Sequence, residues 1–261
     1  MSLGNQYLIL DSHLNNIGVL TTDGATKFTN DSISMQIADT DSSNTQYDDD
    51  VSVGTDDNYR SEVNTNLQSK KYDHQGTVTI PQGQPDSDKI VAGNYLAYYD
   101  TYLDRWYVMY IYTTTEETTT TASVNTVAYV CNMMLRDLAF SVPDAATITN
   151  ESIKTVFTRL FQDSGWELEF NTNNVAIKNT DSFDGKTKGT VLLQNMLQLF
   201  GVEVTAYVKI NSQGKISDKI VEITDELSSS IVYEEAVFGK NVTDIKRTTV
   251  SAPITKLYVY G

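Results

Sequence analysis

Side chains with the chemistry for catalysis or metal binding are few and scattered along this sequence of 261 residues. The two histidines, His13 and His74, stand in unrelated local contexts, so a zinc site would need long-range convergence with a carboxylate. No HExxH spacing, no Gly-x-Ser-x-Gly turn and no Gly-x-x-x-x-Gly-Lys-Ser/Thr loop occurs. Cys131 is the only cysteine and has no local signature of a nucleophile, so we expect a small apolar core residue there. The sequence therefore predicts no catalytic residue, no metal site and no cofactor.

Acidic clusters are the one candidate for a ligand site. The stretch from Asp39 to Asn44, followed by Asp48, Asp49 and Asp50, resembles the start of a calcium loop, because calcium takes several carboxylate oxygens at short spacing. An EF-hand loop would have Gly at its sixth position and Glu at its twelfth, where this stretch has Asn44 and Asp50. We therefore favour a solvated acidic loop over a calcium site at 39–50. A carboxylate pair for glycoside hydrolysis stays open, because the fold sets its spacing.

The elements that must position any site are mostly strands in the first half of the chain. Up to about residue 130 the sequence is rich in Thr, Tyr, Val and Asp, and it predicts a β-meander that begins with 7–10 and 19–20 and continues through 32–38 and 77–80. The aromatic segments 95–99 and 106–112 predict a hairpin that is half buried on one face, with one side of a barrel wall preferred over a sugar-stacking face or a subunit interface. The Thr-rich run 113–121 is expected to be an exposed loop or a continued strand, and 123–130 another strand.

The middle of the chain changes to an alternation of helices and hairpins. Apolar residues from Ile153 to Phe161 recur with the helical period, with Asn150 or Thr149 as N-cap and Gly165 just beyond the end. A hairpin of 166–170 and 175–177 is expected to follow. The same unit then repeats, with a helix from 191 to 200 ended by Gly201 and a hairpin of 202–210 and 216–224. The fold class is therefore α+β, with two helix–hairpin units in an α/β domain over 130–225.

After residue 225 the sequence is again polar and typical of strands, as it would be if the α/β domain were inserted into a barrel. We predict a discontinuous, β-barrel-like domain made of 1–129 plus 226–261, with the α/β domain of 130–225 inserted into it. The N-terminal segment 1–12 has no basic stretch followed by a long apolar run, and nowhere do 18 consecutive apolar residues occur. We expect neither export by a signal peptide nor a membrane span.

The C-terminal stretch 238–248, Phe-Gly-Lys-Asn-Val-Thr-Asp-Ile-Lys-Arg-Thr, and the stretch 254–261, Ile-Thr-Lys-Leu-Tyr-Val-Tyr-Gly, carry a resemblance. Together they resemble a string of the siphophage and prophage tail-associated proteins, the prophage endopeptidase-tail or minor structural protein family, in the hub region at the N-terminus of its members. Weaker matches lie at 7–20 and 201–223. The matched positions, which the resemblance marks as a family signature and a possible subunit interface, are Lys240, Asn241, Asp244, Ile245, Lys246, Arg247, Leu257, Tyr258 and Gly261.

Members of that family resemble the baseplate hub of contractile-tailed phages, with barrel-like domains carrying inserted α/β domains. The resemblance implies a virion structural protein at the tail tip, made in the bacterial cytoplasm and assembled as a homotrimer beneath the distal tail protein ring. It would contact the tape-measure protein, close the tail tube, form part of the DNA ejection conduit and meet the host cell surface only indirectly. Family members continue beyond the position of Gly261, so we expect this chain to be the front portion of a longer protein.

Two other functions stay open beside this structural one. The family name suggests a tail-associated cell-wall hydrolase, a peptidoglycan endopeptidase. The sequence lacks nucleophile and metal motifs, so we expect that this chain is not itself an enzyme. A C-terminal hydrolase of a longer form would lie outside this chain. A host-surface carbohydrate-binding module is suggested by the 16 tyrosines and many threonines, because aromatic faces stack on sugars.

The net charge of −15 bears on partners as well as on function. A chain this acidic repels phosphate, so specific nucleic-acid binding is not expected. The charge is concentrated between Asp11 and Asp104, while 240–256 is basic. A conduit that must release DNA should repel phosphate at its wall, so we expect the acidic residues of 39–50 to face the channel.

Overall fold

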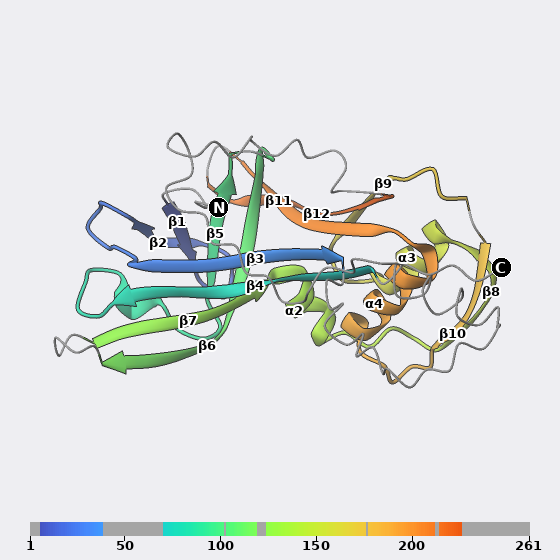
Figure 1. Ribbon diagram of the computed structural model, residues 1–261, viewed down its shortest axis with the longest axis horizontal. Helices are drawn as coiled ribbons and strands as arrows, with labels where there is room; N and C mark the ends of the chain where they lie inside the picture. Colours follow the sequence, from blue (N-terminus) through green and yellow to red (C-terminus); the bar gives the residue numbers. More distant parts are fainter. Residues whose placement is uncertain are drawn as a thin grey trace, which may run out of the picture. The chain divides into compact units, whose positions relative to one another are not determined.

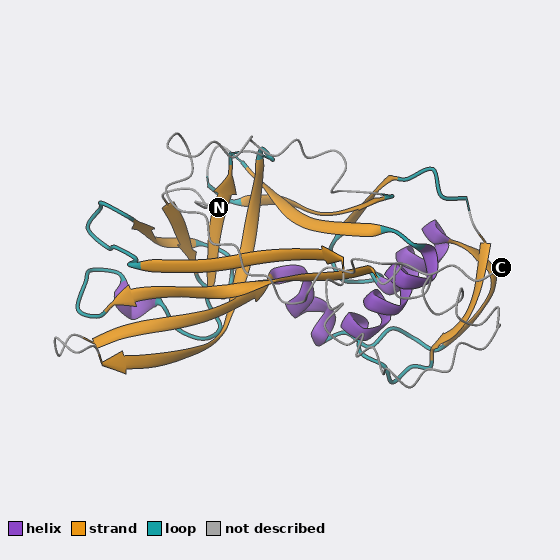
Figure 2. Ribbon diagram, viewed as in Figure 1, coloured by secondary structure: helices purple, strands orange, loops and turns teal. Residues whose placement is uncertain are grey.

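The computed structural model describes residues 6–38, 70–101, 103–118, 124–175, 177–211 and 214–225. The strands lie mostly before residue 133 and the helices after it, as Figures 1 and 2 show. The elements are β1 (Gln6–Leu10), β2 (Asn16–Thr21), β3 (Asn30–Ala38), β4 (Lys70–Pro81), the 3₁₀ turn η2 (Ser87–Lys89), β5 (Tyr95–Asp100), β6 (Arg105–Thr118), β7 (Val124–Asn132), α2 (Met133–Ala139), β8 (Ala146–Ser152), α3 (Ile153–Leu160), β9 (Glu167–Asn171), β10 (Ile177–Phe183), α4 (Gly189–Phe200), β11 (Glu203–Ile210) and β12 (Ile216–Thr224).

Ten of these strands form one branched sheet. Its main path runs β2-β1-β5-β6-β11-β12-β9, and a second path leaves β6 through β7 and β4 to β3. The branch arises on β6, whose one edge pairs with β5, while its other edge meets β11 at Trp106 and β7 from Met109 onward. Gly76 lets β3 approach β4 closely, because a Cβ there would collide with the backbone of Ser32 and Ile33.

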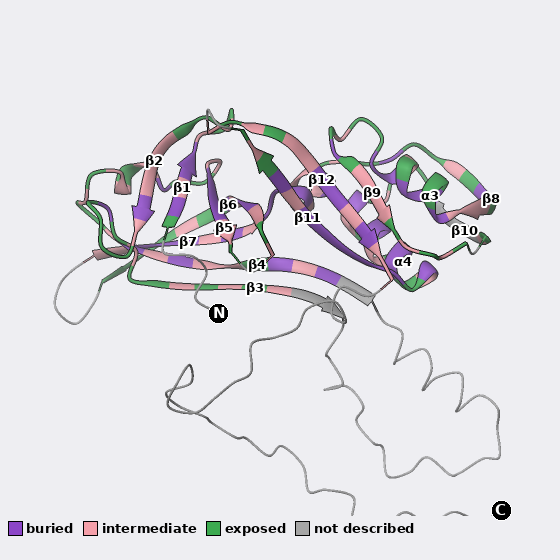
Figure 3. Ribbon diagram, turned by 90° about the horizontal axis from the view of Figure 1, so that it is seen from above, coloured by how far each residue is buried: buried purple, intermediate pink, exposed green. Residues whose placement is uncertain are grey.

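The β5–β6 hairpin is buried on both faces, whereas the sequence predicted burial on one. Leu96 and Met109 point into one hydrophobic cluster, and Tyr95 and Val108 point into another. The hairpin thus forms the wall between two cores, and its buried aromatic residues Tyr95, Tyr98 and Tyr107 pack within these cores. Figure 3 shows buried residues on β1, β4, β11 and β12 as well. The strand β6 runs on to Thr118, so the Thr-rich run continues the strand up to this residue. A continued strand is one of the two forms that the sequence predicted for this run.

The first cluster, here called the sheet-side cluster, is formed almost entirely by side chains from the strands of the large sheet. Strand alternation supplies it from β1, β4, β5, β6 and β7, because every second side chain of a strand points to the same face. Its members include Tyr7, Ile9, Leu20, Val78, Ile80, Ile90, Leu96, Tyr98, Tyr107, Met109 and Ile111.

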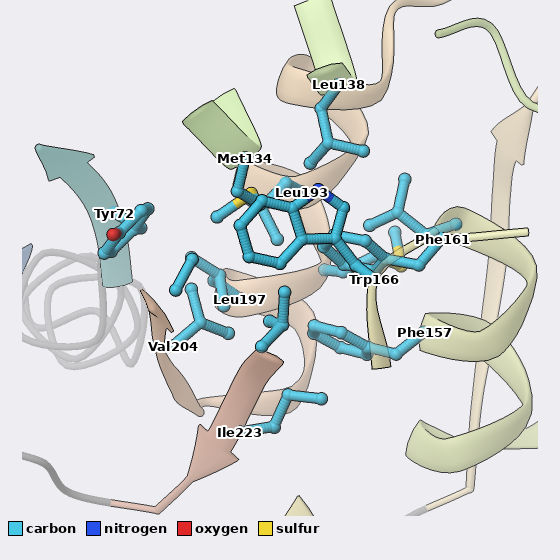
Figure 4. Close-up of a cluster of buried hydrophobic side chains, with 14 of the residues drawn as sticks. Tyr72, Met134, Leu138, Phe157, Phe161, Trp166, Leu193, Leu197, Val204 and Ile223 are labelled. Carbon is cyan, nitrogen blue, oxygen red and sulfur yellow. The ribbon is translucent and has the colours of Figure 1, made fainter. Parts of the chain in front are cut away.

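The second cluster, here called the helix-side cluster, joins the three helices to β11 and β12. Figure 4 shows Trp166, Leu193, Phe157 and Ile223 among the buried side chains of this cluster. Its labelled members are Tyr72, Met134, Leu138, Phe157, Phe161, Trp166, Leu193, Leu197, Val204 and Ile223. Full burial of a Leu or Phe side chain contributes about 1.5 to 3 kcal/mol, so the helices are held mainly by this cluster.

Both predicted helices are present, and one predicted cap is wrong. The helix α3 begins at Ile153 with Ser152 as N-cap, its hydroxyl accepting from the Thr155 amide at 3.3 Å. Asn150 and Thr149, the expected caps, lie in β8 instead, because that segment pairs with β10. The helix α4 ends as expected at Gly201, which adopts the left-handed conformation with φ of 66°.

Only one of the two predicted helix–hairpin units is observed. Strands β11 and β12 form the second hairpin with the expected ends. The first hairpin is wrong: β9 pairs in parallel with β12, and β10 pairs with β8 in a separate two-stranded sheet. The physical reason is that Leu168 and Phe170 gain more burial beside β12 and α3 than a short isolated hairpin would give them.

The α+β class is confirmed, with mostly sheet and few helices. Among the described residues the sheet follows an open path and closes into no barrel. Residues Met1–Ser228 form one compact unit, and β11 and β12 continue the sheet that β1 begins. The division into 1–129 plus 226–261 and 130–225 stays a prediction, because 226–261 lie outside the described residues.

Candidate functional site

A pocket of about 530 Å³ opens beside α2, where five elements converge. We call it the α2 pocket. Such a volume is within the range of pockets that bind small ligands or the side chains of a partner. Strand β4 contributes Tyr72 and Asp73, β6 contributes Tyr110 and Tyr112, β7 contributes Cys131, α2 and its C-cap contribute Leu135, Arg136, Ala139 and Phe140, and α4 contributes Thr190 and Gln194.

The lining of the α2 pocket is largely apolar and in part exposed. Phe140 is 77% exposed, and Tyr112 is about half exposed. Aromatic residues and arginine are the residue types that protein interfaces favour. An exposed Phe beside a hollow is therefore a feature of a binding surface more than of a packed core.

Arg136 lies over two aromatic rings of this pocket. Its guanidinium carbon is 5.2 Å from the ring centre of Tyr110 and 5.3 Å from that of Phe140. One guanidinium nitrogen also meets Asp137 Oδ1 at 3.0 Å. The other oxygen of Asp137 accepts from Trp166 Nε1 at 3.0 Å and faces Lys219 Nζ at 3.6 Å. Asp137 of the same chain therefore balances the charge of Arg136. The aliphatic stem and the guanidinium plane of Arg136 form part of the pocket wall.

The helix α2 owes its position to Asn132, which sequence reasoning missed. The Asn132 Oδ1 atom caps the helix by accepting from the Met134 amide at 2.9 Å, and its Nδ2 donates to the Ala206 carbonyl at 3.1 Å. The same Nδ2 lies 3.2 Å from Nδ1 of His74. One buried side chain therefore links β7, β11, β4 and the N-terminus of α2. The signal in the sequence was an Asn directly before the apolar run Met-Met-Leu, which is a usual N-cap position.

His74 lies at the junction of the two hydrophobic clusters. Its Nδ1 must accept, because Asn132 Nδ2 can only donate, so its Nε2 carries the proton and donates to the Tyr98 hydroxyl at 2.8 Å. Burial lowers the pKa of His74 from 6.5 to about 3, and the ring is neutral. A neutral imidazole that is fully hydrogen-bonded is a structural element that positions α2 and β4.

Two further contacts hold the other walls. Gln194 on α4 pairs with the backbone of Tyr72 in both directions, donating to its carbonyl at 2.9 Å and accepting from its amide at 3.2 Å. Cys131 is partly exposed, which differs from the expected core position. Burial, followed by the nearby Asp73 carboxylate, raises the pKa of its thiol to about 11. This thiol is thus a poor nucleophile at neutral pH.

The residues proposed from the family signature cannot be placed relative to this pocket, because the structure does not describe them. Lys240, Asn241, Asp244, Ile245, Lys246, Arg247, Leu257, Tyr258 and Gly261 lie outside the described residues, as does the acidic segment 39–50. His13 lies in the exposed turn after β1, where its amide donates to Asp11 at 2.9 Å, while His74 is buried. Within the described ranges, no group of three or more His, Cys, Asp or Glu side chains could hold a metal ion. None of the described helices is both long and apolar enough to span a membrane.

The chain is similar to solved structures of phage and prophage tail proteins. It shares 12% identity with prophage tail protein gp18 from Listeria monocytogenes, at a TM-score of 0.45, over 84% of this chain and 50% of that one. An Escherichia coli component of the type VI secretion system, described as structurally similar to the T4 tail proteins gp27 and gp5, matches at 13% identity and a TM-score of 0.41, over 64% and 45%. A Francisella PdpA–VgrG complex matches at 9% and 0.42, over 90% and 31%.

The chain spans half or less of the length of each of these structures. Three of the similar structures, from Listeria monocytogenes, Neisseria meningitidis and a Shewanella oneidensis prophage, are tail proteins, the class to which the C-terminal string pointed. No family model matches the sequence, and no curated protein matches it.

Proposed function

We propose that the protein is a structural component of a phage or prophage tail tip, the hub of its baseplate. The observation that carries this proposal is the C-terminal string at 238–248 and 254–261, with its basic positions Lys240, Lys246 and Arg247. The likeness to solved tail proteins has TM-scores below 0.5 and adds no weight of its own.

The described geometry supports a binding role more than a catalytic one. The α2 pocket is lined by aromatic and aliphatic side chains, its arginine is paired with Asp137, and its thiol has a raised pKa. General acid–base or nucleophilic catalysis requires a group poised near the working pH or activated by a neighbouring base. Among the residues that line the pocket, the groups with shifted pKa are moved away from neutrality. We therefore propose that this chain itself is not an enzyme.

The finer parts of the proposal concern assembly. The protein would form a homotrimer, dock on the distal tail protein ring, contact the tape-measure protein, close the tail tube and form part of the DNA ejection conduit. The segments 1–129 and 226–261 would complete a barrel-like domain around the inserted 130–225. The acidic segment 39–50 would face the conduit, where like charge keeps DNA from adhering.

Deletion of the gene from the phage that encodes the protein tests the proposal. Electron microscopy should show tails with missing or malformed tips, and a plasmid copy should restore them. Normal, infectious tails from the deletion phage would contradict the proposal. Zymography on host cell walls with the purified chain distinguishes the hydrolase alternative: we expect no cleared band, and a clear band would assign an enzyme instead.

A further inference from the structure

Another hollow, of about 860 Å³, opens between α3 and β9, and we call it the α3–β9 groove. It shares no described lining residue with the α2 pocket. Helix α3 contributes mostly polar side chains to its wall, among them Lys154 and Arg159, and β9 contributes Leu168 and Phe170. The volume is within the range of pockets that bind ligands, so this groove is large enough to hold a segment of a partner.

Strand β9 leaves one of its edges open beside this groove. It ends the main path of the sheet and, among the described strands, pairs with β12 alone (Figure 3). The backbone N–H and C=O groups on the other edge of such a strand can pair with an added strand. Leu168 and Phe170 alternate with Glu167 and Glu169 along β9, so the apolar pair points to the groove face and the two glutamates share the opposite face. The open edge therefore has one apolar side and one acidic side.

The helix side of the groove carries positive charge without a counter-charge. Lys154 is exposed and Arg159 is half-buried, and neither belongs to an ion pair within the described ranges. The described residues that line the groove include no Asp or Glu, although the chain has 34 acidic and 19 basic side chains. The groove therefore favours an occupant that brings its own carboxylates, because complementary charges steer partners to such a surface.

We propose that the α3–β9 groove binds an extended acidic segment of another protein, which adds as a strand to the open edge of β9. Alternate side chains of that segment would point into the groove, with apolar ones against Leu168 and Phe170 and carboxylates near the two cations of α3. The side chains between them would lie on the face of the two β9 glutamates and should therefore be neutral. In such strand addition the backbone pairing gives affinity, and the alternate side chains give specificity.

Isothermal titration calorimetry of the full chain with the end-capped peptide Glu-Thr-Val-Thr-Leu-Thr-Glu tests the proposal. In an extended peptide the Glu, Val and Leu side chains fall on one face and the threonines on the other. We expect this peptide to bind, and we expect binding to weaken by about tenfold or more when serine replaces Val and Leu, because their burial is lost. No binding of the parent peptide would overturn the proposal, and equal binding of the serine peptide would reduce the contact to charge alone and contradict it.

Charge-reversal variants of the chain locate the peptide. Arg159→Glu should weaken binding by about fivefold or more and should favour a peptide with Lys in place of both Glu, because the charges are then complementary again. Lys186→Glu makes the same change at an exposed position outside the groove and should bind the parent peptide as the wild type does. Should Arg159→Glu fail to fold by circular dichroism, Lys154→Glu repeats the test in the first turn of α3, where an acidic residue is favourable. Wild-type affinity in the folded groove variant would refute the assignment.

N-methylated peptides test the strand addition itself. Every second amide of an added strand faces its neighbour, and the others face away. Methylation of one set of alternate amides should therefore abolish binding, and methylation of the other set should spare it. Equal effects of the two sets would rule out addition to β9. Deletion microscopy does not depend on this result, so failure of the contact would leave the proposed tail role standing.

Discussion

His74 should make the stability of the protein depend on pH between neutrality and mild acid. Burial lowers its pKa to about 3 in the folded protein, against 6.5 for an ordinary histidine. The unfolded chain therefore binds one more proton than the folded chain between these two values. The contribution of His74 to stability is complete above pH 6.5 and is lost as the pH falls toward 3.

The size of this effect follows from the two pKa values. Each pH unit well inside the window costs about 1.4 kcal/mol, because one pKa unit corresponds to that free energy. Between pH 7 and pH 5 the loss integrates to about 2 kcal/mol. That is a large fraction of the roughly 5 to 15 kcal/mol by which folded proteins are stable.

Urea unfolding at pH 7, 6 and 5 measures the effect. The wild-type protein should lose about 2 kcal/mol more over this range than His74→Gln, in which the titrating group is absent while an amide can still hydrogen-bond to Tyr98 and Asn132. The exposed His13 supplies the matched control, and His13→Gln should follow the wild type. Carboxylates contribute equally to the wild type and to His74→Gln and cancel in that comparison.

Parallel stability curves for the wild type and His74→Gln would refute the reasoning. Should His74→Gln fail to fold, an NMR titration of the wild-type ring decides the matter. The ring signals of His74 should not titrate above pH 5, and a midpoint near 6.5 would refute its burial as a neutral group.

Three further outcomes follow from the same structure. Gly76→Ala should destabilise the protein by about 1 to 3 kcal/mol in urea unfolding, because the new methyl group collides with the β3 backbone; an unchanged midpoint would contradict that pairing. Asn132→Ala should cost about 2 to 4 kcal/mol, since it removes a helix cap and leaves buried partners unsatisfied, and a cost below 0.5 kcal/mol would argue against its linking role. Cys131 should react with iodoacetamide at pH 8 about 100-fold more slowly than a thiol of pKa 9, and an ordinary rate would show that its pKa is not raised.

Local sequence pattern was enough to predict the elements whose burial repeats with a regular period. The helices α3 and α4 and the hairpin of β11 and β12 fell where apolar spacing and the glycine at 201 placed them. The helix α2 was missed, because its seven residues hold too few turns for a period to stand out.

Long-range pairing could not be predicted from the same pattern. The segment 167–171 alternates as any strand does, and nothing in it distinguishes a hairpin with 175–177 from the observed parallel pairing with β12. The double burial of the β5–β6 hairpin likewise depends on which elements cover each face. Side chains that link distant strands, above all His74 and Asn132, looked isolated in the sequence because the partners that they reach on other strands are 24 to 74 residues away.

The central claim, a structural role at the phage tail tip, is tested most directly by cryo-electron microscopy of purified tails from the encoding phage. The account predicts density at the tip into which the described sheet and its three helices fit, repeated around the tail axis below the distal ring. A tip map that accommodates no copy of this fold, in tails whose protein content was verified by mass spectrometry, would contradict the account.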